Sequence, residues 1–178
     1  MDITDPADLT EIVKKVRRAI ADVSGSYGTI IGGLAVQELG YLRWTEDVDV
    51  VADAEHYRDI IENLRNTGFI LKADFTLEMK DSGARLDLLK EGAKLKDSQL
   101  PLPHPSELGP NRGFATLAGL TRLKLDTDRM KDMSDIVELF KKSQARLDDI
   151  PNIRKTIPAP LLEKFDRLAL QARKEAGF

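Results

Sequence analysis

The stretch from Ile30 to Ala52, IIGGLAVQELGYLRWTEDVDVVA, is the most informative part of the sequence about the fold. It begins with apolar residues typical of a short buried strand, continues through Gly32 and Gly33, and then shows helical periodicity up to Gly40. A second apolar strand follows, in which two aspartates alternate with valines. Strand, glycine turn, helix and strand in this order predict an α+β fold.

Hydrophobic periodicity extends this prediction to the rest of the chain. A proline-rich loop separates the strands from a purely helical remainder, because four Pro and two Gly fall between Leu100 and Phe114. We therefore expect a small mixed β-sheet flanked by helices over 1–100, a connecting loop over 101–114, and a helical C-terminal part over 115–178 that packs on the core. The predicted strands are 29–31, 48–52, 69–72, 75–79 and 85–89, and the predicted helices are 7–23, 34–39, 54–66, 117–125, 130–142 and one beginning at Pro160.

The composition of the 178 residues narrows the possible chemistry. With no Cys and two His, the chain offers no disulfide, thiol nucleophile or cysteine-based zinc site. Catalysis would have to rest mainly on carboxylates, Lys and Arg. No segment approaches the roughly 20 apolar residues of a membrane-spanning helix, and the acidic N-terminal region does not resemble a signal peptide. The sequence therefore predicts a cytoplasmic protein without a membrane partner.

The charges are unevenly distributed along the chain. Residues 1–100 carry 13 Lys or Arg and 19 Asp or Glu, whereas residues 101–178 carry 14 and 11. An acidic half joined to a basic half suits a site that holds metal ions and a polyanion together. The alternative is uneven solvation of ordinary surfaces.

The glycine pair Gly32-Gly33 lies between a predicted strand and a predicted helix. Such a turn exposes backbone N–H groups at the positive end of a helix dipole, which is how many proteins bind phosphate. The alternative is a tight turn with no ligand.

Asp47 and Asp49 alternate with valines on the second strand, so both side chains project from the same face. Two carboxylates in a buried strand repel each other unless a cation compensates them, and Mg²⁺ prefers such oxygen ligands. The sequence therefore indicates a magnesium site. The alternative is an edge strand with a solvated acidic face.

Asp87 is the central residue of a third apolar strand, Arg85 to Leu89. If this strand lies beside the second one, Asp87 completes a carboxylate triad of the kind that supports two-metal catalysis. Alone it would be a strand-edge charge or a partner of Arg85, although we expect no same-face pairing of these two residues.

These motifs together resemble the DNA polymerase β-like nucleotidyltransferase superfamily. The pattern is apolar-Gly-Gly, 13 residues, Asp-Val-Asp-Val, and later Leu-Asp-Leu. GGLAVQELGYLRWTEDVDVV is similar to small prokaryotic members, among them AbiE-type abortive-infection toxins and related toxin–antitoxin nucleotidyltransferases. A second segment, LAGLTRLKLDTDRMKDMSDIVEL, resembles the part of the family in which a helix with a Lys precedes an Asp-x-x-Asp helix.

The resemblance implies roles for individual residues. Many members have Gly-Ser where this chain has Gly32-Gly33, so one hydroxyl contact to phosphate is missing. From the residues alone, Lys124 either extends to the surface or meets an anion, and Arg43 and Thr45 either order their turn or touch a phosphate. The implied roles are triphosphate binding by Gly32 and Gly33, metal binding by Asp47, Asp49 and Asp87, phosphate contact by Lys124, and polar positions near the site for Asp132 and Asp135.

The expected activity is Mg²⁺-dependent transfer of a nucleoside monophosphate from an NTP such as ATP to an acceptor hydroxyl. The acceptor is a tRNA or a protein, and a small aminoglycoside-like acceptor also stays open. By the same resemblance, the chain would be the toxin of a toxin–antitoxin or abortive-infection system, with an antitoxin as partner. The alternative is a catalytically inactive nucleotide-binding or partner-binding module with the same fold.

Overall fold

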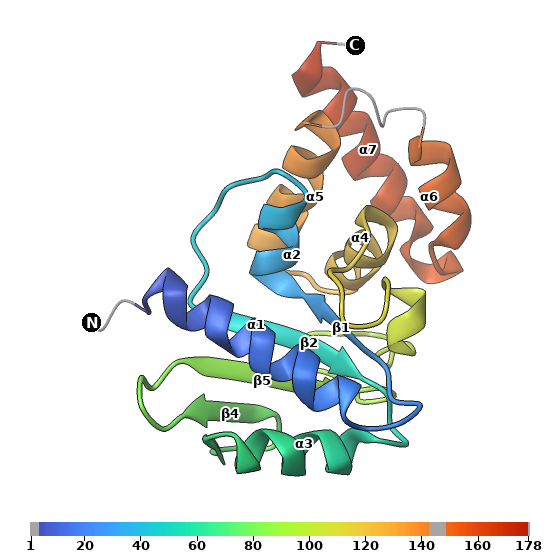
Figure 1. The fold of residues 1–178 in the computed structure, drawn as a ribbon. Coiled ribbons are helices and arrows are strands. Elements are labelled where there is room, and N and C mark those ends of the chain that lie inside the picture. The colour runs from blue at the N-terminus through green and yellow to red at the C-terminus, as the bar shows by residue number, and fades with distance from the viewer. Residues whose placement is uncertain (1–3, 143–148, 178) are drawn as a thin grey trace.

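The computed structural model describes residues 4–142 and 149–177, and its centre is a five-stranded mixed sheet (Figure 1). The strand order is β1-β2-β5-β4-β3, with β2 and β5 parallel and the other neighbours antiparallel. The predicted α+β fold with a small mixed sheet is thus confirmed. The strands are β1 Gly28–Ile31, β2 Asp47–Ala52, β3 Phe69–Leu71, β4 Thr76–Met79 and β5 Arg85–Lys90.

Helices cover both sides of this sheet. Figure 1 shows α1 and α3 across one face, while α4 to α7 gather beyond β1, next to α2. No helix within the described ranges is long and apolar enough to cross a membrane. The α-helices are α1 Pro6–Ala21, α2 Gly32–Glu38, α3 Tyr57–Asn66, α4 Leu117–Leu125, α5 Met130–Lys142, α6 Ile150–Thr156 and α7 Leu162–Ala176.

Local sequence signals explain where several helices begin. Asp5 caps α1 by accepting a hydrogen bond from the backbone N–H of Ala7 at 2.9 Å, and Pro6 occupies the first helical position. Thr116 caps α4 in the same way, through the N–H of Gly119 at 3.1 Å. These signals are local, so the starts of both helices agree with prediction to within a residue.

The C-terminal region differs from prediction in two places. The sequence analysis did not predict α6, and it placed the start of the last helix at Pro160. In the structure Pro160 belongs to a 3₁₀ turn, Ala159–Leu161, and α7 begins at Leu162. Pro160 still initiates helical structure, since its fixed φ suits a 3₁₀ turn that leads into the helix.

The sheet separates two hydrophobic clusters. On β2, Val48 and Val50 point to the α1 and α3 side, while Val51 belongs to the cluster formed with α2 and the C-terminal helices. On β5, Leu88 likewise points to the α1 and α3 side, and Leu89 packs against the cluster on the other side. Because side chains alternate along a strand, the aspartates of both strands lie on the face of Val51 and Leu89, which the C-terminal helices cover.

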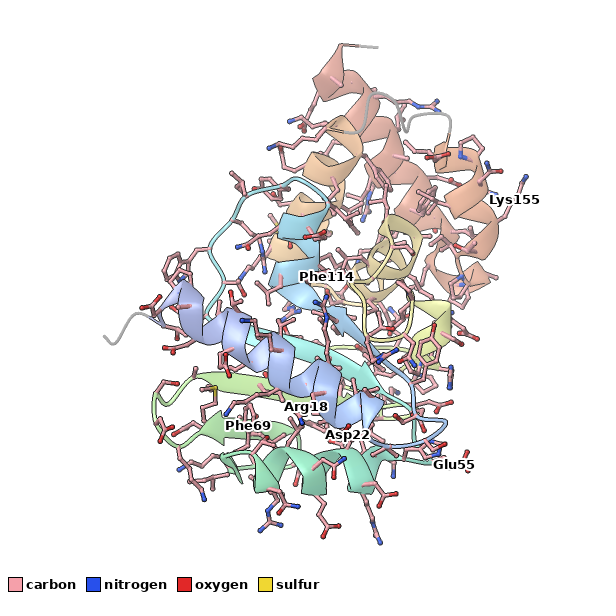
Figure 2. All side chains as sticks on the ribbon, in the orientation of Figure 1. Arg18, Asp22, Glu55, Phe69, Phe114 and Lys155 are labelled. Carbon is pink, nitrogen blue, oxygen red and sulfur yellow. The ribbon has the colours of Figure 1, made fainter. Side chains whose placement is uncertain are left out.

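The connection over 101–114 lies along the outer edge of β1. Its backbone exchanges hydrogen bonds with Ile30, which donates to Gly113 at 2.8 Å and accepts from Ala115 at 2.7 Å. Phe114 in this segment, labelled in Figure 2, packs against both hydrophobic clusters. The guanidinium of Arg17 on α1 lies over its ring, 5.3 Å from the centroid. The predicted loop therefore also contributes to the sheet edge, and it contains a 3₁₀ turn, Pro105–Glu107.

Candidate active site

Three carboxylates meet at one end of the face that the C-terminal helices cover. The parallel register of β2 and β5 places Asp49 directly opposite Asp87, and Asp47 lies two residues earlier on the same face. One carboxylate oxygen of each residue lies within 4.8 Å of the others, and all three side chains are partly buried. The pairing that was expected to bring Asp87 to the other two aspartates is present.

The electrostatics of this triad show how closely the charges are packed. Burial, followed by repulsion from Asp47 and Asp87, raises the pKa of Asp49 from 3.8 to about 7. Burial and the charge of Asp87 also raise the pKa of Asp47, although Arg85 and Lys131 act in the opposite direction. A bound cation would relieve this repulsion.

Asp87 is held by neighbours on its own strand and the next one. The hydroxyl of Thr76 on β4 donates to Oδ1 of Asp87 at 2.7 Å. Nη2 of Arg85 lies 3.6 Å from Oδ2 of Asp87. The alternative of a partnership with Arg85 is therefore present, and the expectation that the two side chains would not share a face was wrong, because they are two positions apart on β5.

Gly32 begins α2 directly beside the triad. Its φ is +68°, and a β carbon at this position would overlap with Oδ2 of Asp49. Glycine is therefore required both by the left-handed backbone conformation and by the approach of the carboxylate. The turn brings the first backbone N–H groups of α2 next to the triad.

Gly33 is in close contact with the loop that precedes β2. A β carbon here would lie 2.6 Å from Oγ1 of Thr45 and 3.1 Å from Nη2 of Arg43. A serine at residue 33 would therefore collide with Thr45, which gives a steric reason for the Gly-Gly sequence. The Thr45 hydroxyl donates to the carbonyl of Asp47 at 3.3 Å, so Thr45 also orders the turn before β2.

A buried ionic network links this loop to α4 and α5. Nζ of Lys124 donates to Asp132 at 2.8 Å and to Oδ2 of Asp135 at 2.7 Å. Nη1 of Arg43 donates to the same Oδ2 of Asp135 at 3.0 Å. Lys124 has a side-chain exposure of 7%, so the alternative that it extends to the surface is wrong. Nε of Arg43 is buried without a hydrogen-bond partner in the described part of the chain.

Asp132 connects the end of α4 to the start of α5. Burial alone would raise its pKa, but Lys124, Thr127 and Arg129 outweigh this effect and lower it. Oδ2 of Asp132 accepts from Thr127 and from Nε of Arg129, both at 2.7 Å. Asp132 therefore remains ionised and orients three neighbours around the junction between the two helices.

Ten residues were given a role from the sequence, and all of them except Thr45 and Asp135 line one cavity of about 380 Å³. Thr45 lies behind Gly33, at the edge of a second cavity. The sequence analysis missed the apolar wall opposite the triad, which comes from the segment before Leu102 and from α4, and it missed Asp126. The proline cluster was the available signal for this wall, because a proline-rich loop in a compact domain is often functional.

The donor set fits a hard divalent cation. Three carboxylates and no nitrogen or sulfur ligand converge at this point among the described residues, and oxygen ligands are those that Mg²⁺ prefers. The absence of a side chain at Gly32 allows the Asp49 carboxylate to lie directly against the glycine turn. Asp47, Asp49 and Asp87 are therefore the residues that could hold such an ion.

Comparisons with known proteins give structural likenesses only. No protein-family model matches the chain, and no curated protein matches it by sequence. Nucleotidyltransferases are among the similar solved structures. ANT(2")-Ia in complex with adenylyl-2"-tobramycin has 16% identity and a TM-score of 0.48 over 95% of this chain and 98% of its own. A nucleotidyltransferase-like antigenic protein of Paracoccidioides brasiliensis has 15% identity and a TM-score of 0.47 over 91% of this chain and 93% of its own. The Thermotoga maritima CCA-adding enzyme complexed with tRNA has 13% identity and a TM-score of 0.40 over 98% of this chain and 52% of its own.

Proposed function

We propose that the protein is a Mg²⁺-dependent nucleotidyltransferase that moves a nucleoside monophosphate from an NTP to an acceptor hydroxyl and releases pyrophosphate. The observation that carries this proposal is the convergence of Asp47, Asp49 and Asp87 next to the glycine turn at Gly32. Carboxylates beside a glycine turn at a helix start supply the two things that phosphoryl chemistry requires, which are cation binding and phosphate positioning.

The three aspartates would divide the work between them. Asp47 and Asp49 hold the metal ions, and Asp87 ligates one ion and accepts the proton of the attacking hydroxyl. Two bound divalent ions would stabilise both the attacking and the leaving oxygen of an in-line displacement. Thr76 and Arg85 keep the Asp87 carboxylate oriented while it does so.

The glycine turn beside the triad and the neighbouring ionic network would bind the triphosphate. The backbone N–H groups of Gly32 and Gly33 face the phosphates, while Lys124 and Arg43 supply positive charge from the ionic network. Asp135 holds both of these cations on the same oxygen, so they act from fixed positions. ATP is the first NTP to test.

The acceptor and the biological role are further parts of the proposal. A hydroxyl of a tRNA or of a protein is the acceptor. The chain acts as the toxin of a toxin–antitoxin or abortive-infection pair, and an antitoxin is its partner. This role rests on the sequence resemblance. Induction of the chain in a bacterial host should stop growth, and induction of Asp49→Asn should not.

The direct test is incubation of the protein with each α-labelled NTP, Mg²⁺, and total tRNA or total cell protein. We expect label on one of the acceptors, complete loss of labelling in Asp49→Asn, and normal labelling in Asp81→Asn, which changes an exposed aspartate that does not line the cavity. No label on any acceptor, together with NTP binding that does not need Mg²⁺, would contradict the enzyme proposal.

One observation favours the alternative of an inactive binding module. Lys124 and Arg43 are already paired with carboxylates, which reduces the positive charge left for a triphosphate. Such a module would bind NTP or a partner without transferring the label. The labelling experiment separates the two functions, because both bind nucleotide and only the enzyme consumes it.

A further inference from the structure

The segment over 93–103, which we call the strap, runs along one side of the candidate active site. Its two ends are held together by backbone hydrogen bonds, from Gly92 to the carbonyl of Leu102 and from Leu102 to the carbonyl of Ala93, both at 2.9 Å. The strap is therefore a closed loop whose base is fixed next to the end of β5.

The strap is also held at Gln99 and Leu100 by a side chain from another element. The carboxylate of Asp126, the C-cap of α4, accepts hydrogen bonds from the backbone N–H groups of Gln99 at 3.0 Å and Leu100 at 3.2 Å. Backbone-to-carboxylate bonds of this kind are charge-assisted and fix a loop in one conformation. Asp126 therefore determines the distance between the strap and α4.

The strap and α4 enclose an apolar slot in the cavity. Leu120 and Lys124 are four residues apart, so the helix presents its hydrocarbon wall and its cation to the same space. The slot is continuous with the triad, since Leu89 lines it from the same face of β5 as Asp87. The side chains that form the slot are Leu89, Leu95, Leu100, Leu102, Leu120 and Leu123.

The cavity thus has three chemically different walls: the carboxylates of β2 and β5, the cations of the ionic network, and the leucines of the slot. A ligand that fills it must carry an anionic group at one end and a flat or apolar group at the other. Among the strap residues that line the cavity, Ser98 is the one polar side chain, so the strap offers mainly hydrocarbon surface to the apolar end of the ligand.

We infer that the slot between the strap and α4 holds the nucleobase of the NTP, and that Asp126 is a positioning residue that shapes the slot. This inference rests on the proposed function, because it uses the triad and the cations to place the triphosphate. A base has the required apolar faces, and pockets that bind small ligands are lined mainly by hydrophobic side chains of this kind.

The test compares two ligands that share the phosphates and differ in the base. ATP and inorganic tripolyphosphate are titrated separately into the full-length protein with Mg²⁺, and Kd is measured calorimetrically, without turnover. Leu95→Ser and Leu123→Ser change half-buried leucines of the slot, and Leu170→Ser changes an exposed leucine on α7 as a matched control. We expect both slot variants to bind ATP about 10-fold more weakly, from the loss of apolar contact, with tripolyphosphate binding unchanged.

Asp126 is tested by graded substitution. Asp126→Ala removes both acceptor oxygens and should weaken ATP binding, while Asp126→Asn keeps one acceptor and should recover part of the affinity. Tripolyphosphate binding should stay constant in both variants, which a general loss of structure would not allow.

The outcomes distinguish this inference from the proposed function. Equal weakening of ATP and tripolyphosphate binding, or no change for either ligand, would overturn the slot and leave the proposed function standing. If the wild-type protein binds tripolyphosphate but not ATP, both the slot and the proposed function are wrong.

Discussion

Gly32 and Asp49 are in direct contact: the carboxylate of Asp49 occupies the space that a β carbon on residue 32 would need. The contact ties the glycine turn to the metal-binding strand, so that the N–H groups of the turn and the carboxylates cannot be displaced independently. It also means that a methyl group added at residue 32 is a precise perturbation of the site.

Gly32→Ala should lose the Mg²⁺ response and the proposed activity. Left-handed backbone at an alanine costs roughly 1–2 kcal/mol, and the new methyl group would displace Asp49 as well. Gly40→Ala is the matched control, because Gly40 has a φ of +98° and nothing lies within 4 Å of its β-carbon position. Urea unfolding should show destabilisation in both variants, whereas the rise in Tm on adding Mg²⁺ and ATP should vanish only in Gly32→Ala. If Mg²⁺ and ATP raise the Tm of Gly32→Ala as much as that of the wild type, the glycine turn does not form part of the binding site.

Asp49→Asn should stabilise the metal-free protein at high pH. The pKa of Asp49 is about 7 in the folded state, above its ordinary value of 3.8, so the folded state holds this proton more tightly than the unfolded state. Stability is therefore lost as the pH rises from about 4 to about 7, and a neutral asparagine removes the loss.

The check is the Tm of both proteins in EDTA at pH 4.5 and pH 8. We expect the Tm of Asp49→Asn to exceed that of the wild type by more at pH 8 than at pH 4.5. Asp81→Asn, at an exposed position, should show no such trend. Mg²⁺ should raise the Tm of the wild type and not that of Asp49→Asn, since a ligand that binds only the folded state stabilises it. A constant Tm difference at the two pH values would refute the argument.

Arg43 and Asp135 should be energetically coupled. Asp135 is 2% exposed, and removal of one partner from a buried ion pair typically costs roughly 3–5 kcal/mol. A double-mutant cycle with Arg43→Gln and Asp135→Asn, measured by urea unfolding, should give a coupling energy of roughly 1–3 kcal/mol. The same cycle on the exposed pair Arg154 and Asp166 should give a much smaller value. Strict additivity at Arg43 and Asp135 would show that the network has no cooperative role.

His56 should stabilise the fold more at pH 6 than at pH 9. Its Nδ1 lies 2.6 Å from Oδ1 of Asp53, and this hydrogen bond raises the pKa of His56 above 6.5. The contribution is fully present below pH 6.5, where the imidazole is charged in both states, and is lost as the pH rises through the folded-state pKa. The free energy of unfolding of His56→Gln relative to the wild type, measured at both pH values, checks this. An equal difference at pH 6 and pH 9 would be inconsistent with a charged pair.

The fold and the acidic triad follow from short-range patterns in the sequence. Alternation on β2 places Asp47 and Asp49 on one face of the sheet. The apolar character of β5 indicates a central strand, and its pairing with β2, which sets Asp87 opposite Asp49, confirms this position. These features depend on the period of a strand and on burial, and both can be read from a few adjacent residues.

The contacts around the triad depend on residues that are distant in the chain. Asp135 meets Arg43 across 92 positions, and no local pattern indicates that Arg43 and Lys124 donate to the same Asp135 oxygen. The contact of Asp126 with the strap could not be predicted from the sequence either, because its partners are backbone N–H groups, which almost any residue type provides. The helix α6 is short, and its apolar Ile150 and Ile153 give too few positions to establish a period.

The closure of the β1 edge by residues 112–115 has a consequence for synthesis on the ribosome. β1 is made early, yet the segment that pairs with its outer edge is made more than 80 positions later. Until that segment emerges, the nascent chain exposes unpaired backbone groups on β1, which other strands can use for aggregation. Aggregation of ribosome-bound intermediates should therefore fall sharply once Phe114 and its neighbours have left the exit tunnel, well before α7 is complete.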